Sequence, residues 1–378
     1  MSDDAQAPDV GSVNVAIALQ AALAARRETF LARYPRKVKL AATGLLLVLL
    51  VLPLFMGGGA HVRPSYRAAH DVAPEEEMDL ASIPTTLDKT PTKERHEPKT
   101  EAEQQAATAN DANTEPLSIA PDMALVEETP TGFLPKIAED GRRPWQVYAR
   151  TFDFRDPRPR IALVIGDMGF SRVATDAALH RLPPAVTLAF DAQGTSIDEW
   201  VTRARQDGHE TLLSLPMEPF DYPRNDSGPK SLLTTLPNSD NMVRLRDVLR
   251  LAQGYVGLTT LSGSRFVTDS VKMEPVLEEA RKRGLLFLDS KISSHSIISD
   301  LAVKMKVPTA QSVRFIDSTP TPQAIDAALA QLEQIARVEG AVVAMAEPLP
   351  VTLDRIEIWA RHLRERGVAL VPLSSVVR

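Results

Sequence analysis

The stretch from Ile161 to Phe170, IALVIGDMGF, carries the clearest fold signal in the chain. Its apolar run, 161–165, is typical of a strand that is buried on both faces of a parallel sheet. A single acid, Asp167, follows between two glycines, as where a buried strand delivers a carboxylate to the edge of an α/β fold. Three roles stay open for Asp167: one half of a catalytic pair, the remaining half of a broken pair, or an ordinary turn residue.

From this strand to the C-terminal end, apolar runs alternate with helical patterns. Strands are expected at 161–165, 186–190, 210–215, 257–258, 285–289, 309–310 with 314–315, 341–346 and 369–372. Helices are expected at 175–181, 196–207, 241–252, 273–282, 296–305, 321–339 and 352–365, the last with Thr352 as its N-cap. This order predicts a parallel sheet with helices outside it. About seven or eight such units favour a barrel over an open sheet, and no glycine-rich phosphate loop follows the first strand.

The composition of the 378-residue chain excludes several classes of function. There is no cysteine, which excludes disulfides, cysteine–zinc sites and thiol chemistry. The formal net charge of −6 gives no reason to expect nucleic acid as a partner.

The uncharged segment Leu40–Ala60 is long and apolar enough to predict one transmembrane helix. Six basic residues lie between 26 and 39 on its N-terminal side, whereas only Arg63 and Arg67 follow it closely. This bias predicts that the N-terminus is in the cytoplasm and that the chain after Ala60 lies on the other side of the membrane. A cleaved signal peptide is the alternative, but the 39 residues before the apolar run are long for one.

The rest of the chain divides by composition. Residues 1–39 form the predicted cytoplasmic tail, and residues 61–130, rich in proline, threonine and acids, predict a disordered linker. Aromatic residues return after Thr131. We therefore expect a globular domain over 131–378, with an ordered lead-in packed on it.

Catalytic and binding residues of a parallel barrel lie where its strands end. That rule selects Asp167, Asp191, Met217, Glu218, the stretch 259–265, Asp289, Asp317 and Glu347. Acids gathered at one rim repel one another, so they usually serve a cation, a proton transfer or a hydroxyl-rich ligand. A helix N-cap is the alternative role for each acid, above all for Asp191 and Asp317.

The segments ALVIGDMG, LPMEPFDYPRNDSGP, GSRF, FLDS and AMAEP follow one another in this order. In this order they resemble the divergent polysaccharide deacetylase family of bacterial envelope proteins, over about residues 131–376. The resemblance implies a distorted seven-stranded (β/α) barrel on the outer side of the inner membrane. It also implies kinship with enzymes that remove N- or O-acetyl groups from polysaccharides.

The resemblance further implies a site with a divalent metal such as zinc, bound by one Asp and two His, and a second Asp as the base. Asp167 stands at the metal-binding Asp position, whereas Gly166 stands at the base position. Leu261 and Glu347 stand at the two His positions. Leucine cannot bind a metal, and glycine cannot act as a base, so only Asp167 and Glu347 remain as ligands if a metal binds.

Three hypotheses follow. In the first, a catalytically degenerate family member binds cell-envelope polysaccharide, peptidoglycan or an envelope protein through a groove with Asp167, Met217, Glu218, Ser264, Arg265, Asp289 and Asp317. In the second, an active metal-dependent deacetylase or other hydrolase uses a rearranged site. Its catalytic acids would be Asp167 and Asp289, with Glu347 and the loop residue His295 near the metal. In the third, the barrel only displays a surface for a partner.

Overall fold

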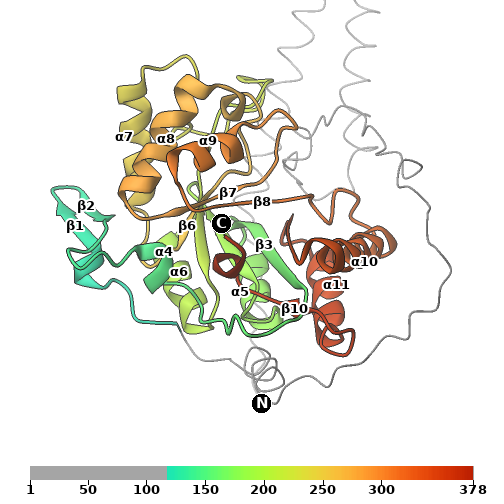
Figure 1. The fold of residues 1–378 in the computed structure, drawn as a ribbon. Coiled ribbons are helices and arrows are strands. Elements are labelled where there is room, and N and C mark those ends of the chain that lie inside the picture. The colour runs from blue at the N-terminus through green and yellow to red at the C-terminus, as the bar shows by residue number, and fades with distance from the viewer. Residues whose placement is uncertain (1–116, 378) are drawn as a thin grey trace, which may run out of the picture. The chain divides into compact units, whose positions relative to one another are not determined.

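Strands and helices alternate through most of residues 117–377, the part of the chain that this computed structural model describes (Figure 1). The parallel strands are β3 (Arg160–Met168), β4 (Thr187–Asp191), β5 (Thr211–Ser214), β6 (Gly257–Thr259), β7 (Leu286–Asp289), β8 (Thr309–Gln311), β9 (Ala341–Ala346) and β10 (Ala369–Leu370). The helices are α5 (Arg172–Arg181), α6 (Ile197–Gln206), α7 (Asn238–Leu249), α8 (Ser270–Lys282), α9 (Ile298–Met305), α10 (Pro322–Glu339) and α11 (Pro350–Arg361). The predicted alternation of strands and helices is confirmed.

The strands form one parallel sheet that is a nearly closed barrel. Its order is β10-β3-β4-β5-β6-β7-β8, and β9 pairs with the other side of β3. The segment 313–316 after β8 closes the ring, because Val313 N donates to Val343 O and Ile316 N donates to Met345 O, each at 2.9 Å. Strands β3 to β9 therefore make the predicted seven-stranded ring, and the short β10 is added beside β3.

Alternate residues of each strand face the barrel interior and the surrounding helices. Ala162 and Val164 of β3 belong to an inner apolar cluster, while Ile161, Leu163 and Ile165 pack in the larger cluster under the helices. The same alternation runs through β4, β5, β7 and β9. It fixes which residues near the strand ends point inward.

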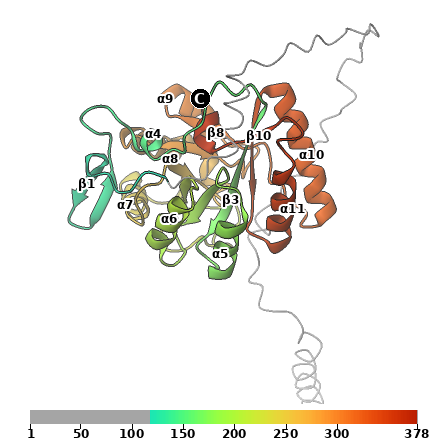
Figure 2. The same cartoon turned by 90° about the horizontal axis from the view of Figure 1, so that it is seen from below.

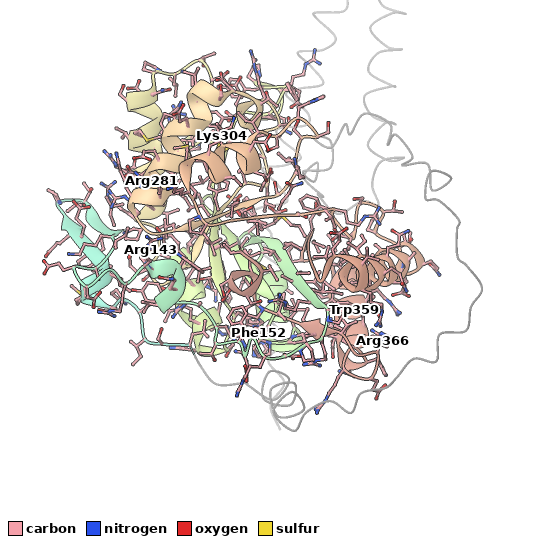
Figure 3. The ribbon with its side chains drawn as sticks, viewed as in Figure 1. Arg143, Phe152, Arg281, Lys304, Trp359 and Arg366 are labelled. Atoms are coloured by element: carbon pink, nitrogen blue, oxygen red, sulfur yellow. The ribbon has the colours of Figure 1, made fainter. Side chains whose placement is uncertain are left out.

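Helices cover the outside of the barrel as a ring, with α5 beside α11, α11 beside α10, and α8 between α7 and α9 (Figures 1 and 2). A polar contact fastens α10 to α11. Glu333 accepts a hydrogen bond from Trp359 Nε1 at 2.8 Å and two from Arg366 Nε at 3.0 Å each. Trp359 and Arg366 lie close together in Figure 3, in agreement with the 3.0 Å bond from Arg366 to the Trp359 carbonyl.

The lead-in closes the N-terminal end of the barrel, as predicted for an ordered segment. It contains η3 (Met123–Leu125), the hairpin of β1 (Val126–Thr129) and β2 (Gly132–Pro135), and α4 (Pro144–Val147). The hairpin stands to one side of the barrel in Figure 1. Leu125 and Tyr148 join the inner apolar cluster together with Leu373 near the C-terminus, in the 3-10 helix η5 (Leu373–Val376). The buried Glu210 carboxylate accepts bonds from Arg150 N and Ser374 N, which ties both segments to the start of β5.

Some predicted boundaries differ from the structure. η3 and β1 precede Thr131, where the domain was expected to begin, because Leu125 and Val126 are apolar anchors in a polar stretch. The last long helix begins at Pro350 with Leu349 as its N-cap, so the prediction of Thr352 as the cap is wrong. The predicted segments 1–39 and 40–60, and most of 61–130, lie outside the described residues. Within 117–377, no helix has the length and apolar character that a membrane span requires.

Candidate functional site

The carboxyl ends of the barrel strands gather most of the predicted site residues at one edge. β3 arrives there with a bulge, because its pairing with β4 shifts register between Ile165 and Met168. Asp167 lies in the bulge with a left-handed backbone, φ 52°. Such a conformation is costly for a residue other than glycine, and it is commonly found at functional sites. The delivery of Asp167 to the edge of the sheet, predicted from IALVIGDMGF, is confirmed.

The loops after β3 and β4 are held against each other by their backbones. Thr195 N donates to Gly169 O at 3.2 Å. A Cβ on Gly194 would stand 2.9 Å from the backbone of Gly169, so a side chain at this position would push the two loops apart. Their contact keeps Asp167 and the end of β4, Asp191, in one neighbourhood.

Leu261 occupies the space beside Gly166. A Cβ added to Gly166 would lie 2.5 Å from Leu261 Cδ1 and 3.1 Å from Cδ2. Leu261 is 3% exposed and packs in the inner apolar cluster with Ala162 and Val164. Gly166 and Leu261, which the resemblance puts at the base position and one His position, therefore pack against each other beside β3.

Two other acids at this edge, Asp191 and Asp317, act on Asp167. Burial, and then the charges of Asp191 and Asp317, raise the pKa of Asp167 to about 7. Burial raises the pKa of Asp191 to about 6, against the lowering effect of its hydrogen bond from Gln193 N (2.7 Å) and of Lys230. Carboxyl groups that titrate near neutral pH suit proton transfer or the binding of a cation.

Asp191 and Asp317 are not helix caps. The N-cap of α6 is Ser196, and that of α10 is Thr321. Asp317 is buried instead, where its Oδ2 accepts a bond from Glu347 N at 2.8 Å and one from Thr352 Oγ1 at 2.9 Å. The N-cap alternative that the sequence left open for these two acids is wrong, because Asp191 ends β4 and Asp317 lies in a turn, each before the N-cap of its helix.

The predicted groove residues after β5 and β6 form a linked cluster. Glu218 is buried, accepts bonds from Thr234 N and Oγ1, and pairs with Arg265 Nη1 at 3.2 Å. Met217 N donates a hydrogen bond to Ser262 Oγ at 3.1 Å. Ser264 Oγ accepts a bond from Phe220 N at 3.1 Å. This cluster fixes the two loops to each other and leaves the Arg265 side chain half exposed.

Asp289 organises the loop that follows β7. Its carboxylate accepts bonds from Lys291 N, Ser296 Oγ and Ser299 Oγ at 3.0–3.1 Å, and it is almost completely buried. His295 lies on the same loop with an exposed side chain. The catalytic role predicted for Asp289 stays a prediction, and its contacts in the structure give it a role in loop conformation.

A zinc-type site does not fit the residues at this edge. Leu261, which the resemblance puts at one His position, is 3% exposed and packs against Gly166, and Glu347, which it puts at the other, is half-buried. Within residues 117–377, no three side chains of Asp, Glu, His or Cys are grouped so that they could hold a metal ion. Asp167 and Glu347, the two predicted metal ligands, therefore have no third ligand beside them among the described residues, and His295 does not provide one.

Sequence reasoning missed two residues in the barrel mouth. Ser214 ends β5 and Ser290 directly follows β7, both almost fully buried, and neither hydroxyl has a hydrogen-bond partner in the described structure. The sequence signal that could have found them is the two-residue alternation of inward-facing and outward-facing side chains along each strand. Ser214 and Ser290 stand two residues after Leu212 and Leu288, which face the barrel interior.

Comparison with known proteins identifies the family of this chain. The model of the divergent polysaccharide deacetylase family matches residues 163–377. The chain belongs to this family. A solved structure of an uncharacterized protein from Agrobacterium tumefaciens C58 is similar, with 36% identity, a TM-score of 0.64, and coverage of 65% of this chain and 100% of that chain.

Two curated relatives of this divergent polysaccharide deacetylase family member are uncharacterized proteins. YibQ of Escherichia coli K12 is 25% identical over 219 residues, which cover 58% of this chain and 67% of YibQ. A protein of Haemophilus influenzae Rd is 22% identical over 226 residues, 60% of this chain and 79% of its own. The matched region contains every strand of the barrel except the first residues of β3.

Proposed function

We propose that this protein binds cell-envelope glycan in the periplasm through the C-terminal edge of its barrel, without a catalytic metal. The observation that carries the proposal is the contact of Leu261 with Gly166. This apolar packing stands where the resemblance leads us to expect a base and a metal ligand, and the match to the family and the acids at the barrel mouth support a role in binding.

The edge of the barrel offers the surfaces that a sugar chain needs. Phe170 follows β3 and is 53% exposed, and Phe220 follows β5 and is 60% exposed. Exposed aromatic rings are flat apolar surfaces on which the carbon face of a sugar ring can stack. The carboxyl oxygens of Asp167 and Asp191 between these loops can accept bonds from sugar hydroxyls.

The proposal includes a membrane anchor. The apolar segment 40–60, with basic residues before it, supports a single transmembrane helix with a cytoplasmic N-terminus. The proline- and acid-rich residues that follow support a tether that lets the barrel reach material beyond the inner membrane.

Co-sedimentation with purified peptidoglycan tests the proposal. We expect the detergent-solubilised full-length protein to bind, and Phe170→Ala and Phe220→Ala each to weaken binding about threefold to tenfold. Phe154→Ala is the matched control. Phe154 is an aromatic residue that is 70% exposed, but it lies before β3, at the opposite end of the barrel.

The proposal is contradicted if the wild-type protein does not sediment with peptidoglycan or with chitin-type polymers. It is also contradicted if Phe154→Ala weakens binding as much as Phe220→Ala. In that case the carboxyl end of the barrel is not the binding surface.

An active hydrolase is the second candidate, and the pKa of about 7 at Asp167 favours it, because general bases work best near the ambient pH. Release of acetate from acetylated chitooligosaccharide or peptidoglycan, lost in Asp167→Asn, would establish this function. We expect no acetate above the level of the Asp167→Asn variant.

A further inference from the structure

The carboxyl group of Asp167 lacks a hydrogen-bond donor and a counter-charge. Among the described residues its carboxyl group accepts no hydrogen bond and pairs with no cation, and its charged neighbours Asp191 and Asp317 are both acids. Lys230, whose ammonium group donates to Ala192 O at 3.2 Å, lowers the pKa of Asp191, so Asp191 has a counter-charge that Asp167 lacks among the described residues. The mouth of the barrel therefore holds one carboxyl group, that of Asp167, whose acceptors and charge the described residues do not satisfy.

A second observation points to a missing group at the same place. Asp191 and Ser214 are register partners on neighbouring parallel strands, and both follow inward-facing residues, Ala189 and Leu212. Their side chains therefore project into the barrel mouth from adjacent positions. Ser214 is 1% exposed, and its Oγ has no hydrogen-bond partner among residues 117–377. A buried hydroxyl without a partner is rare, and one explanation is a polar group that arrives with a ligand.

Ser290, which directly follows β7, is a second buried serine that faces the barrel interior. Leu288 faces inward, so Ser290, two residues later, faces the same interior. Ser290 is fully buried, and its Oγ also has no hydrogen-bond partner within the described part of the chain. Hydroxyls without partners thus enter the mouth from two strands, β5 and β7.

From this arrangement we infer that the barrel mouth binds the protonated amino group of a deacetylated amino sugar. An ammonium group donates three hydrogen bonds and carries one positive charge, which matches the acceptors of Asp167, Asp191 and Ser214. An acetamido group is neutral and leaves the carboxylate charges unbalanced. A metal ion lacks a suitable group of ligands among residues 117–377.

The inference rests on the proposed function and makes it more specific, because it names which form of the glycan is bound. The chain would recognise the product of a deacetylation rather than perform one. A reaction that removes acetyl groups from envelope amino sugars must then precede binding.

Calorimetric titration of the full-length protein at pH 7 tests this inference, with the glucosamine tetramer and the N-acetylglucosamine tetramer as probes. We expect the glucosamine tetramer to bind at least about tenfold more tightly. Asp167→Asn and Asp191→Asn should each remove that preference. Asp207→Asn, an exposed acid at the end of α6, is the control and should keep it.

Ser214→Ala adds a readout that a purely structural role would not give. Removal of an unsatisfied buried hydroxyl should raise the Tm by about 2–4 °C, while the affinity for the glucosamine tetramer falls about tenfold. A variant that binds as the wild-type protein does would overturn the assignment of Ser214.

The outcomes separate this inference from the proposed function. Equal affinity for the two tetramers overturns the inference and leaves glycan binding intact. Binding of neither tetramer, together with no binding to peptidoglycan, overturns both. Binding that requires added zinc or manganese overturns the inference in favour of a metal site.

Discussion

Replacing Gly166 by alanine should lower the free energy of unfolding by about 1–3 kcal/mol, the usual cost of overpacking a filled core. The new Cβ would lie 2.5 Å from Leu261 Cδ1, and Leu261 is enclosed by the inner apolar cluster. The backbone of Gly166 is in a conformation that other residues adopt, so the cost comes from this contact and not from backbone strain. Without the contact, alanine at this position would stabilise the protein slightly by restricting the unfolded chain.

The matched experiment is a double-mutant cycle measured by urea unfolding. Leu261→Ala alone should cost about 2–5 kcal/mol, because it leaves a cavity in the barrel mouth. The double variant, Gly166→Ala with Leu261→Ala, should have a free energy of unfolding about 1–3 kcal/mol higher than the sum of the two single effects predicts. The reason is that the alanine methyl group at position 166 fills part of the cavity left by Leu261. Additive effects within about 0.5 kcal/mol would show that the two side chains do not share this space.

Asp167→Asn should stabilise the protein at pH 8 and have little effect at pH 4. In the folded state the pKa of Asp167 is about 7, against 3.8 for the unperturbed group, so the folded protein binds more protons than the unfolded chain between these values. Stability therefore falls as the pH rises through that window, and the full cost of the ionised carboxylate is present above pH 7.

The asparagine variant removes the ionisation and its cost. We expect a gain of about 1–3 kcal/mol at pH 8, which is less than the full shift implies because Asp167 keeps some exposed surface. Urea unfolding at pH 4 and pH 8 measures the difference, with the exposed Asp207→Asn as control. A gain of equal size at both pH values would contradict a raised pKa at Asp167.

The sequence allowed the strands and their order to be predicted well. Strand β9 was expected at 341–346 and has those bounds, because an apolar run lies between Gly340 and the Glu347–Pro348 turn. Asp167 was expected just after the first barrel strand and lies near the carboxyl end of β3, which continues to Met168. These features depend on the spacing of apolar and turn residues along the chain, which can be seen in a single sequence.

The contacts within the site could not be predicted in the same way. The family resemblance indicated the substitutions at Gly166 and Leu261 as two separate losses. It did not show that the two residues contact each other and so join β3 to the loop after β6. Thr352 matched the pattern of a helix N-cap, whereas its hydroxyl bonds to Asp317 across the barrel edge. Such contacts depend on how distant segments meet, which periodicity does not encode.

The role of the acids was only partly visible in the sequence. The strand-end rule selected Asp191, Asp289 and Asp317 together, but it could not separate their surroundings. Asp289 is satisfied by the serines of its own loop, while Asp167 has no such partner among the described residues. The difference lies in neighbouring loops that the sequence does not place.

The central claim, that the family's metal site is closed, is tested most directly by metal analysis of the tag-free full-length protein. After incubation with excess zinc, manganese or nickel and desalting, we expect far less than one ion per chain, unchanged by Asp167→Ala. The variant Gly166→Asp/Leu261→His/Glu347→His, which restores the family's ligand types, serves as the comparison. One tightly held ion per wild-type chain that Asp167→Ala removes would contradict the claim.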